Sequence, residues 1–290
     1  MVKHLYRTLL LWLFCWTQTG MLQADDTIRL LCIGNSFSWD AVEQELVPLC
    51  NAAGQPIVVG NLYYGGCSLA QHHTFLQQDT AAYEFRYLTN DTTIRLKTYA
   101  LRQALTGYHW DYISLQQASH DSGITATYEP FLSALIDSVR HYQPQAILCW
   151  MQTWSYSSDA KHPAFPRYQN SQRVMDDSIQ LATRYVLQRH PDLHLVPCGA
   201  AIRLARRRLG DTLCRDGYHL NYTYGRYLAS CVWLEFLRKE EKQIDSAHRL
   251  QDIRRNPYRH PAMTRRQQRI TQSAAHRVIY YPPPADCLGA

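Results

Sequence analysis

The chain has 290 residues, of which 46% are hydrophobic and 19% are charged, and its formal net charge is +6. This length fits one large domain or two small ones, and the apolar content is that of a globular protein with a sizeable core, not of a disordered chain. No apolar stretch is long enough to span a membrane and no nucleic-acid recognition motif is present, so we expect neither a membrane span nor a nucleic-acid partner.

The first 24 residues differ in kind from the rest. Lys3 and Arg7 precede an apolar run over residues 9–16, and small or polar residues follow up to Ala24. This order is typical of a secretory signal peptide, and the run is shorter than the roughly 20 residues that cross a bilayer. A buried N-terminal helix is the alternative. We expect residues 1–24 to be a signal peptide and the protein to be exported, to the periplasm or out of the cell.

Short apolar runs then alternate with helical patterns. The expected strands are residues 28–33, 57–62, 112–115, 146–151 and 193–197. The expected helices are residues 41–53, 99–105, 130–142, 168–189, 202–208 and 224–237. Strands that alternate with helices predict a parallel sheet covered on both faces, so we expect an α/β fold, a three-layer α/β/α sandwich with five parallel strands. Its site should lie at the carboxyl ends of the strands.

Two polar stretches, residues 72–90 and 154–167, are expected to be loops that shape the site. We place one domain at residues 25–238 and a basic extension with one helix, residues 264–278, at 239–290. We expect this extension to pack on the same domain. Its arginines indicate either a solvated helix face or attraction to an acidic polymer or a membrane surface.

Nine cysteines are present, and removal of Cys15 with the signal peptide leaves eight. One or two disulfides are possible in an exported protein, but several cysteines lie in apolar strand patterns, where a free thiol acts as a small hydrophobe. No zinc spacing and no H-E-x-x-H motif occur, so we expect no metal and no cofactor.

Two short motifs carry the parts of a serine hydrolase. The first strand ends in Gly34-Asn35-Ser36, which places a hydroxyl where a strand turns into a helix. Asp216 and His219 lie three residues apart, so one tight turn can present both side chains together. A serine hydroxyl needs a base within hydrogen-bond reach, and a carboxylate can orient that base. We therefore expect Ser36 as nucleophile, His219 as base and Asp216 as its partner.

A tetrahedral intermediate also needs hydrogen-bond donors aimed at its oxygen. The N–H of Ser36 and that of Gly66, where glycine allows close backbone approach, can supply two. The third donor should follow the third strand, where we favour Gln117, with Gln116 and His120 as alternatives.

These motifs resemble those of the SGNH hydrolases, also called GDSL-like esterases and lipases, over residues 28–237. Gly34-Asn35-Ser36-Phe37-Ser38 is similar to the first block of the family, and Gly66 is similar to the glycine of the second block. Asp216-Gly217-Tyr218-His219 is similar to the fifth block. The resemblance implies a flavodoxin-like sandwich and the same catalytic residues.

The third block departs from the family pattern. Ala118-Ser119-His120-Asp121 stands where the family has G-x-N-D, so the resemblance does not fix the third donor. It is closer to a less characterised subgroup with Leu115-Gln116-Gln117 at this place and Trp154 in a loop after the fourth strand.

Three further residues are candidates for binding substrate: Asn35, His72 and Trp154. Trp154 could stack on a sugar ring or pack in the core, and His72 could line the site or be solvated. The expected function is an exported esterase that removes acetyl or similar small acyl groups from a carbohydrate or other small ester. The alternatives are a non-catalytic carbohydrate-binding protein on the same scaffold and an O-acyltransferase. The α/β-hydrolase fold is disfavoured because no G-x-S-x-G surrounds Ser36. No sequence feature fixes an oligomeric state.

Overall fold

The computed structural model describes residues 27–244, 253 and 256–282, so the expected signal peptide lies outside the described residues. The strands are β1 (Ile28–Gly34), β2 (Ile57–Tyr63), β3 (Tyr83–Leu88), β4 (Thr93–Tyr99), β5 (Tyr112–Leu115), β6 (Ile147–Met151) and β7 (His194–Val196). The α-helices are α2 (Ser36–Val42), α3 (Leu46–Ala52), α4 (Leu69–Gln77), α5 (Leu101–Thr106), α6 (Phe131–Tyr142), α7 (Gln172–Arg189), α8 (Cys198–Leu209), α9 (Tyr224–Ile244) and α10 (Arg265–Tyr280). Two short 3-10 helices are η1 (Thr125–Thr127) and η2 (Phe165–Tyr168).

All seven strands form one sheet in the order β4-β3-β2-β1-β5-β6-β7. Five strands, β2, β1, β5, β6 and β7, are parallel to one another. β3 pairs antiparallel with β2, and β4 pairs antiparallel with β3. The expected α/β fold with a mostly parallel sheet is confirmed. The expected strand number of five is wrong, because the β3–β4 hairpin extends the sheet to seven.

The hairpin was missed because β4 lacks the apolar pattern of a buried strand. Residues 72–90 were expected to form a loop, yet they contain most of α4 and all of β3. All but the last residue of β4 are exposed, so neither face of this edge strand selects apolar side chains. Ile94 and Leu96 are exposed to 47% and 39%.

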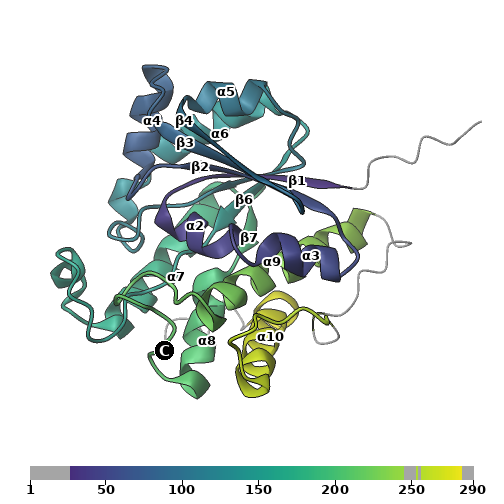
Figure 1. Cartoon of the computed structure of the whole chain (residues 1–290). Coiled ribbons are helices and arrows are strands. Elements are labelled where there is room, and N and C mark those ends of the chain that lie inside the picture. The colour runs from purple at the N-terminus through teal and green to yellow at the C-terminus, as the bar shows by residue number, and fades with distance from the viewer. Residues whose placement is uncertain (1–26, 245–252, 254–255, 283–290) are drawn as a thin grey trace, which may run out of the picture.

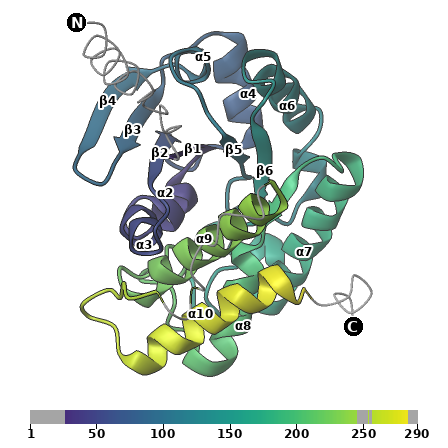
Figure 2. The same ribbon diagram turned by 90° about the vertical axis from the view of Figure 1, so that its right-hand side faces the viewer.

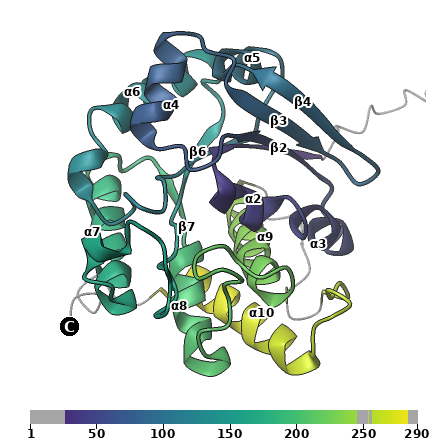
Figure 3. The same cartoon turned by 60° about the vertical axis from the view of Figure 1, so that its left-hand side comes forward.

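Helices cover both faces of the sheet. Figures 1 and 3 show α4, α5 and α6 on one face and α2, α3 and α9 on the other. The side chains of β1 alternate between the two cores: Leu30 and Cys32 belong to one, and Leu31 and Ile33 to the other. This alternation follows from the strand repeat of two residues. β1, the middle strand of the seven-stranded sheet, therefore anchors the segment that follows it.

The chain after residue 238 is continuous with the domain. α9 extends across the expected boundary at residue 239 to Ile244, and α10 packs against α8 and α9 (Figure 2). The expected helix over residues 41–53 is two helices, α2 and α3, separated at residues 43–45.

The seven cysteines in the described part of the chain are all free, so the possible disulfides are not found among them. None of the described helices is both long and apolar enough to cross a membrane.

Candidate active site

Ser36 stands where β1 ends and α2 begins. Asn35 caps the helix in an extended conformation, and Ser36 is the first helical residue. A Cβ atom on Gly34 would lie 2.5 Å from the hydroxyl oxygen of Ser38, so only glycine permits this close approach. Ser36 is half-buried, and its N–H, as the first of the helix, has no acceptor within that helix. A hydroxyl and a free N–H therefore stand together at the end of a central strand.

Asn35 ties together the segments that follow three strands. Its Oδ1 accepts hydrogen bonds from the Phe37 N–H at 3.0 Å and from Gln116 Nε2 at 2.8 Å. Its Nδ2 donates to the carbonyl oxygen of Cys67 at 3.0 Å. We expected Asn35 to bind substrate, but its side chain is 1% exposed and its amide is engaged by protein atoms. Asn35 instead holds the segments after β1, β2 and β5 in register.

Gly66 lies in a turn that follows β2. The N–H of Cys67 donates to the carbonyl oxygen of Tyr64 at 3.2 Å, which closes the turn. Gly66 is exposed, and its φ of 65° is in the left-handed region that favours glycine. Among the described residues its N–H has no acceptor, and an added Cβ would meet nothing within 4 Å. This turn leaves a backbone donor next to open space.

Gln116 and Gln117 turn their amides in different directions. Gln117 Nε2 donates to the carbonyl and hydroxyl oxygens of Thr127 at 3.2 and 3.1 Å. Its Oε1 accepts from the N–H groups of Leu69 and Ala118 at 3.0 and 2.8 Å. Both amide hydrogens of Gln117 are thus used, and the residue is 0% exposed. Contrary to our expectation, Gln117 has no free N–H to offer a substrate.

The two alternative donors are placed differently. Gln116 uses one amide hydrogen on Asn35 and has no further partner in the described structure. Its amide carbon would lie 3.2 Å from a Cβ on Gly34, so it adjoins the strand end that precedes Ser36. His120 Nε2 lies 3.6 Å from Asp121 Oδ2. Gln116 therefore keeps a spare amide hydrogen and contacts Asn35, the residue that precedes Ser36.

Asp216 and His219 lie in a tight hairpin between α8 and α9. The Arg215 N–H donates to the carbonyl oxygen of His219, and the Asn221 N–H donates to that of Leu213, both at 2.8 Å. Between these bonds the chain reverses through Gly217, whose φ is 91°. An added Cβ at Gly217 would also lie 3.0 Å from Ala160, so the turn requires glycine for both reasons.

This turn brings the carboxylate onto the imidazole. Asp216 Oδ2 lies 2.7 Å from His219 Nδ1, and Oδ1 accepts the N–H groups of His219 and Tyr218 at 2.8 and 3.2 Å. Partial burial raises the pKa of Asp216, but the hydrogen bonds from His219 and Tyr218 outweigh it and the net pKa is lowered. Asp216 is therefore ionised at neutral pH and holds the proton of His219 on Nδ1.

Aromatic rings join this hairpin to α2. The ring of Phe37, next to Ser36, meets the ring of His219 edge-on at 6.2 Å between centroids. The ring of Trp154 stacks on that of Phe37, with the centroids 4.1 Å apart and the planes at 4° to each other. Trp154 Nε1 donates a hydrogen bond to the carbonyl oxygen of Tyr218 at 2.8 Å. Trp154 is 0% exposed, so of the two roles that the sequence left open, sugar stacking and core packing, the structure shows core packing. Within the described contacts no hydrogen bond joins Ser36 Oγ to His219.

Asp40 connects the same two segments through buried charge and was missed by the sequence analysis. It lies one helical turn after Ser36, and its Oδ2 accepts the N–H of Leu220 at 2.7 Å. Arg215 Nη1 and Arg226 Nε donate to its Oδ1 at 3.0 and 2.9 Å. Burial raises the pKa of the fully buried Asp40 carboxyl, and the neighbouring cations oppose that shift. The only sequence signal was one charged residue within an otherwise uncharged helix.

A second missed residue, His162, lies beside the hairpin that carries Asp216 and His219. Its ring is 4.9 Å from that of Tyr218 and 4.7 Å from that of Tyr156, between centroids. Its Nδ1 accepts the N–H of Ala164 at 3.1 Å, so a neutral His162 carries its proton on Nε2. Burial and nearby imidazoles lower the pKa of His162. Tyr156 also shares a hydrogen bond of 3.0 Å with the hydroxyl of Ser119.

His72, in contrast, lies inside the core on the α4 side. It is 1% exposed, and its Nδ1 is 2.8 Å from the hydroxyl oxygen of Tyr83, on which its ring stacks. Burial lowers the pKa of His72 to about 3. We expected this histidine to line the site, but the structure surrounds it with protein instead of substrate.

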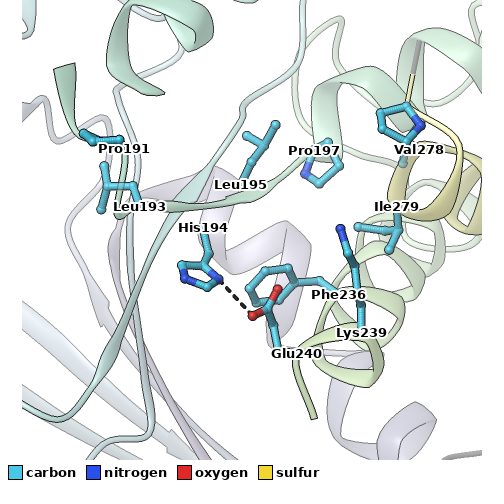
Figure 4. Close-up of a pocket in the computed structure, with 11 residues that line it drawn as sticks. Pro191, Leu193, His194, Leu195, Pro197, Phe236, Lys239, Glu240, Val278 and Ile279 are labelled. Atoms are coloured by element: carbon cyan, nitrogen blue, oxygen red, sulfur yellow. Dashed lines mark hydrogen bonds and ion pairs between the residues drawn. The ribbon is translucent and has the colours of Figure 1, made fainter. Parts of the chain in front are cut away.

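A cavity elsewhere contains none of these residues. It lies between β7, α9 and α10, where His194 Nδ1 is 2.9 Å from Glu240 Oε2 (Figure 4). Over the described residues there is no group of three or more His, Cys, Asp or Glu side chains that could hold a metal ion.

Comparison with known proteins identifies relatives. The family model described as "Domain of unknown function (DUF4886)" matches residues 29–278. The crystal structure of a DUF4886 family protein from Bacteroides uniformis ATCC 8492 is 37% identical, with a TM-score of 0.82, over 89% of this chain and 96% of that one. A candidate SGNH hydrolase from Slackia heliotrinireducens is 21% identical, with a TM-score of 0.50, over 73% of this chain and 99% of that one. The similarity to that structure confirms the fold relationship to SGNH hydrolases that the motifs implied. The search of curated proteins found no match.

Proposed function

This chain belongs to the DUF4886 family, whose description states no activity, and we propose that it is a serine esterase that forms an acyl-enzyme on Ser36. The observation that carries the proposal is the Asp216–His219 pair at 2.7 Å, held against the helix that begins with Ser36. Carboxylate, imidazole and hydroxyl are the three groups that a serine hydrolase needs.

The proposed reaction uses each of these groups in turn. Ionised Asp216 keeps the proton of His219 on Nδ1, which leaves Nε2 free to accept the Ser36 proton. The serine oxygen attacks the ester carbonyl, and the alcohol leaves with the proton from His219. Water then hydrolyses the acyl-serine by the same path. Catalytic hydrogen bonds of this kind often form only when substrate is bound. This accords with the lack of a hydrogen bond between Ser36 and His219 in the described structure.

We propose three hydrogen-bond donors for the oxyanion. The N–H groups of Ser36 and Gly66 have no acceptor in the described structure, and we assign the third donor to the spare amide hydrogen of Gln116. Gln117 is unsuited because Thr127 occupies both of its amide hydrogens.

We propose a small acyl group, in the first place acetyl, on a carbohydrate. Ser119 and His162 are partly exposed, and the His162 ring lies against that of Tyr218 in the hairpin, so their hydroxyl and imidazole groups can hydrogen-bond a hydroxylated alcohol. We further propose that residues 1–24 direct export, which the mass of the mature N-terminus recovered from cell fractions would test.

Hydrolysis of short aryl esters and acetylated oligosaccharides by the purified protein tests the esterase proposal. We expect acetate release that Ser36→Ala abolishes while far-UV circular dichroism stays unchanged. Equal rates for wild type and Ser36→Ala, or no release from any ester, would contradict it and favour a binding protein. Product that carries the acyl group on an added sugar would instead indicate an acyltransferase.

A further inference from the structure

Two neighbouring helices far from the sheet concentrate positive charge. α8 and α10 contain four arginines each and no acidic residue. They pack against each other, and α10 forms the outer surface of the molecule here (Figure 2). This charge has no part in the proposed esterase reaction.

Five of these arginines meet where the two helices adjoin. Arg207 and Arg208 lie in the last turn of α8, and Arg265, Arg266 and Arg269 lie in the first turns of α10. Arg266 Nη2 donates to the carbonyl oxygen of Arg208 at 3.0 Å, which joins the two groups. All five are exposed, and none forms an ion pair with any described residue. We call these five residues the α8–α10 arginine surface.

The inward arginines of α8 behave differently. Arg203 Nη1 lies 3.4 Å from Asp177, and Arg206 Nε lies 3.1 Å from Asp211. Arginines with an internal role in this fold therefore have an acidic partner. The arginine surface lacks one, so packing and internal pairing do not account for it.

The placement of these five arginines also lowers the stability of the fold. Cations near the C-terminus of a helix are favourable, which explains Arg207 and Arg208, but cations in the first turn oppose the helix dipole. Arg265 and Arg269 are in addition a like-charged pair four residues apart, which destabilises a helix. A bound anion would offset this repulsion by forming ion pairs with the arginines.

We propose that the α8–α10 arginine surface binds an acidic polysaccharide through its carboxylate or sulfate groups. The planar guanidinium group matches these anions with two parallel hydrogen bonds. A membrane surface is less well matched, because the apolar residues of α10, such as Ile270, Val278 and Ile279, are buried and cannot insert into lipid. Nucleic acid is less well matched because α8 and α10 display no exposed aromatic side chain for base stacking.

The α8 part of this surface lies close in the sequence to the hairpin that carries Asp216 and His219. α8 ends one residue after Arg208, and Arg206 contacts Asp211 and Cys214 of the segment that leads into Asp216. The binding proposal itself does not depend on the esterase proposal, since binding is measured without catalysis.

A matched pair of triple variants tests the proposal. The first carries Arg265→Gln, Arg266→Gln and Arg269→Gln. The control carries Arg95→Gln, Lys97→Gln and Arg102→Gln, which removes the same charge from exposed positions on β4 and α5, away from α10 (Figure 1). Circular dichroism and thermal unfolding verify that both variants fold.

Binding of polygalacturonate is measured by titration calorimetry at about 50 mM and about 200 mM salt, because electrostatic binding weakens as salt rises. We expect wild type, Ser36→Ala and the control triple to bind alike, and the α10 triple to bind at least about tenfold more weakly. The proposal is overturned if wild type does not bind, if both triples lose affinity equally, or if duplex DNA or phosphatidylglycerol vesicles bind more tightly. Binding is also measured with Ser36→Ala, so the result can be interpreted even if the esterase proposal fails.

Discussion

The carboxylate of Asp40 accepts a hydrogen bond from the backbone N–H of Leu220 at 2.7 Å, across 180 residues of sequence. Asp40 lies in the helix that begins with Ser36, and Leu220 follows His219 directly. This bond therefore fixes the hairpin that carries the proposed base against the helix that carries the proposed nucleophile. Arg215 and Arg226 neutralise the buried charge.

Asp40→Asn should destabilise the fold strongly. The change leaves two buried guanidinium groups without their anion, and breaking a buried ion pair costs about 3–5 kcal/mol. Urea denaturation measures the loss. The matched control is Asp79→Asn, which removes an exposed partner of Arg102 and should cost less than about 1 kcal/mol. Equal effects of the two substitutions would show that Asp40 does not anchor the hairpin.

Asp216→Asn should keep the fold and lower turnover by about 10⁴-fold, as the same change does in a serine protease triad. The amide cannot hold the imidazole proton on Nδ1 as the carboxylate does. The measurement is kcat for an aryl acetate together with the unfolding midpoint. Near-normal turnover would remove Asp216 from the mechanism.

Gln116→Ala and Gln117→Ala should separate catalysis from stability. Loss of an oxyanion donor costs about 10²–10³-fold in kcat, and we expect this for Gln116→Ala. Gln117→Ala leaves the N–H of Leu69 unpaired, so its main effect should be on the free energy of unfolding. If kcat falls only for Gln117→Ala, with the fold intact, the donor has been assigned to the wrong residue.

His72 should make the protein sensitive to acid. Its folded pKa of about 3 lies below the unfolded value near 6.5, so the unfolded chain binds an extra proton below that pH and stability falls as pH decreases. Between about pH 8 and about pH 5 wild type should lose about 2 kcal/mol more than His72→Gln. Denaturant titration at both pH values measures this difference. Gln71→Ala, on the same helix, is the control and should keep the wild-type slope.

The local parts of the site could be predicted from the sequence. A glycine, a cap residue and a serine after an apolar run specify a strand-to-helix turn, and Asp-Gly before His219 specifies a tight turn. Each motif depends on neighbours within a few residues. The structure places all of them where the sequence analysis expected.

The long-range parts could not be predicted in this way. The partners of Asp40 lie 175 to 186 residues away, and no local pattern reports such distances. Successive residues at a strand end point in opposite directions, so a shift of one position decides between Gln116 and Gln117. The sequence left Trp154 undecided and misplaced His72, because aromatic and imidazole side chains suit both a core and a binding surface.

Reaction with a serine-directed phosphonate, followed by intact-mass measurement and peptide mapping, tests the central claim most directly. The account predicts one adduct per molecule, located on Ser36, that forms slowly in His219→Ala and is absent in Ser36→Ala. A folded wild-type protein whose Ser36 stays unmodified after prolonged exposure to the reagent, or an adduct that maps to another serine, would contradict it.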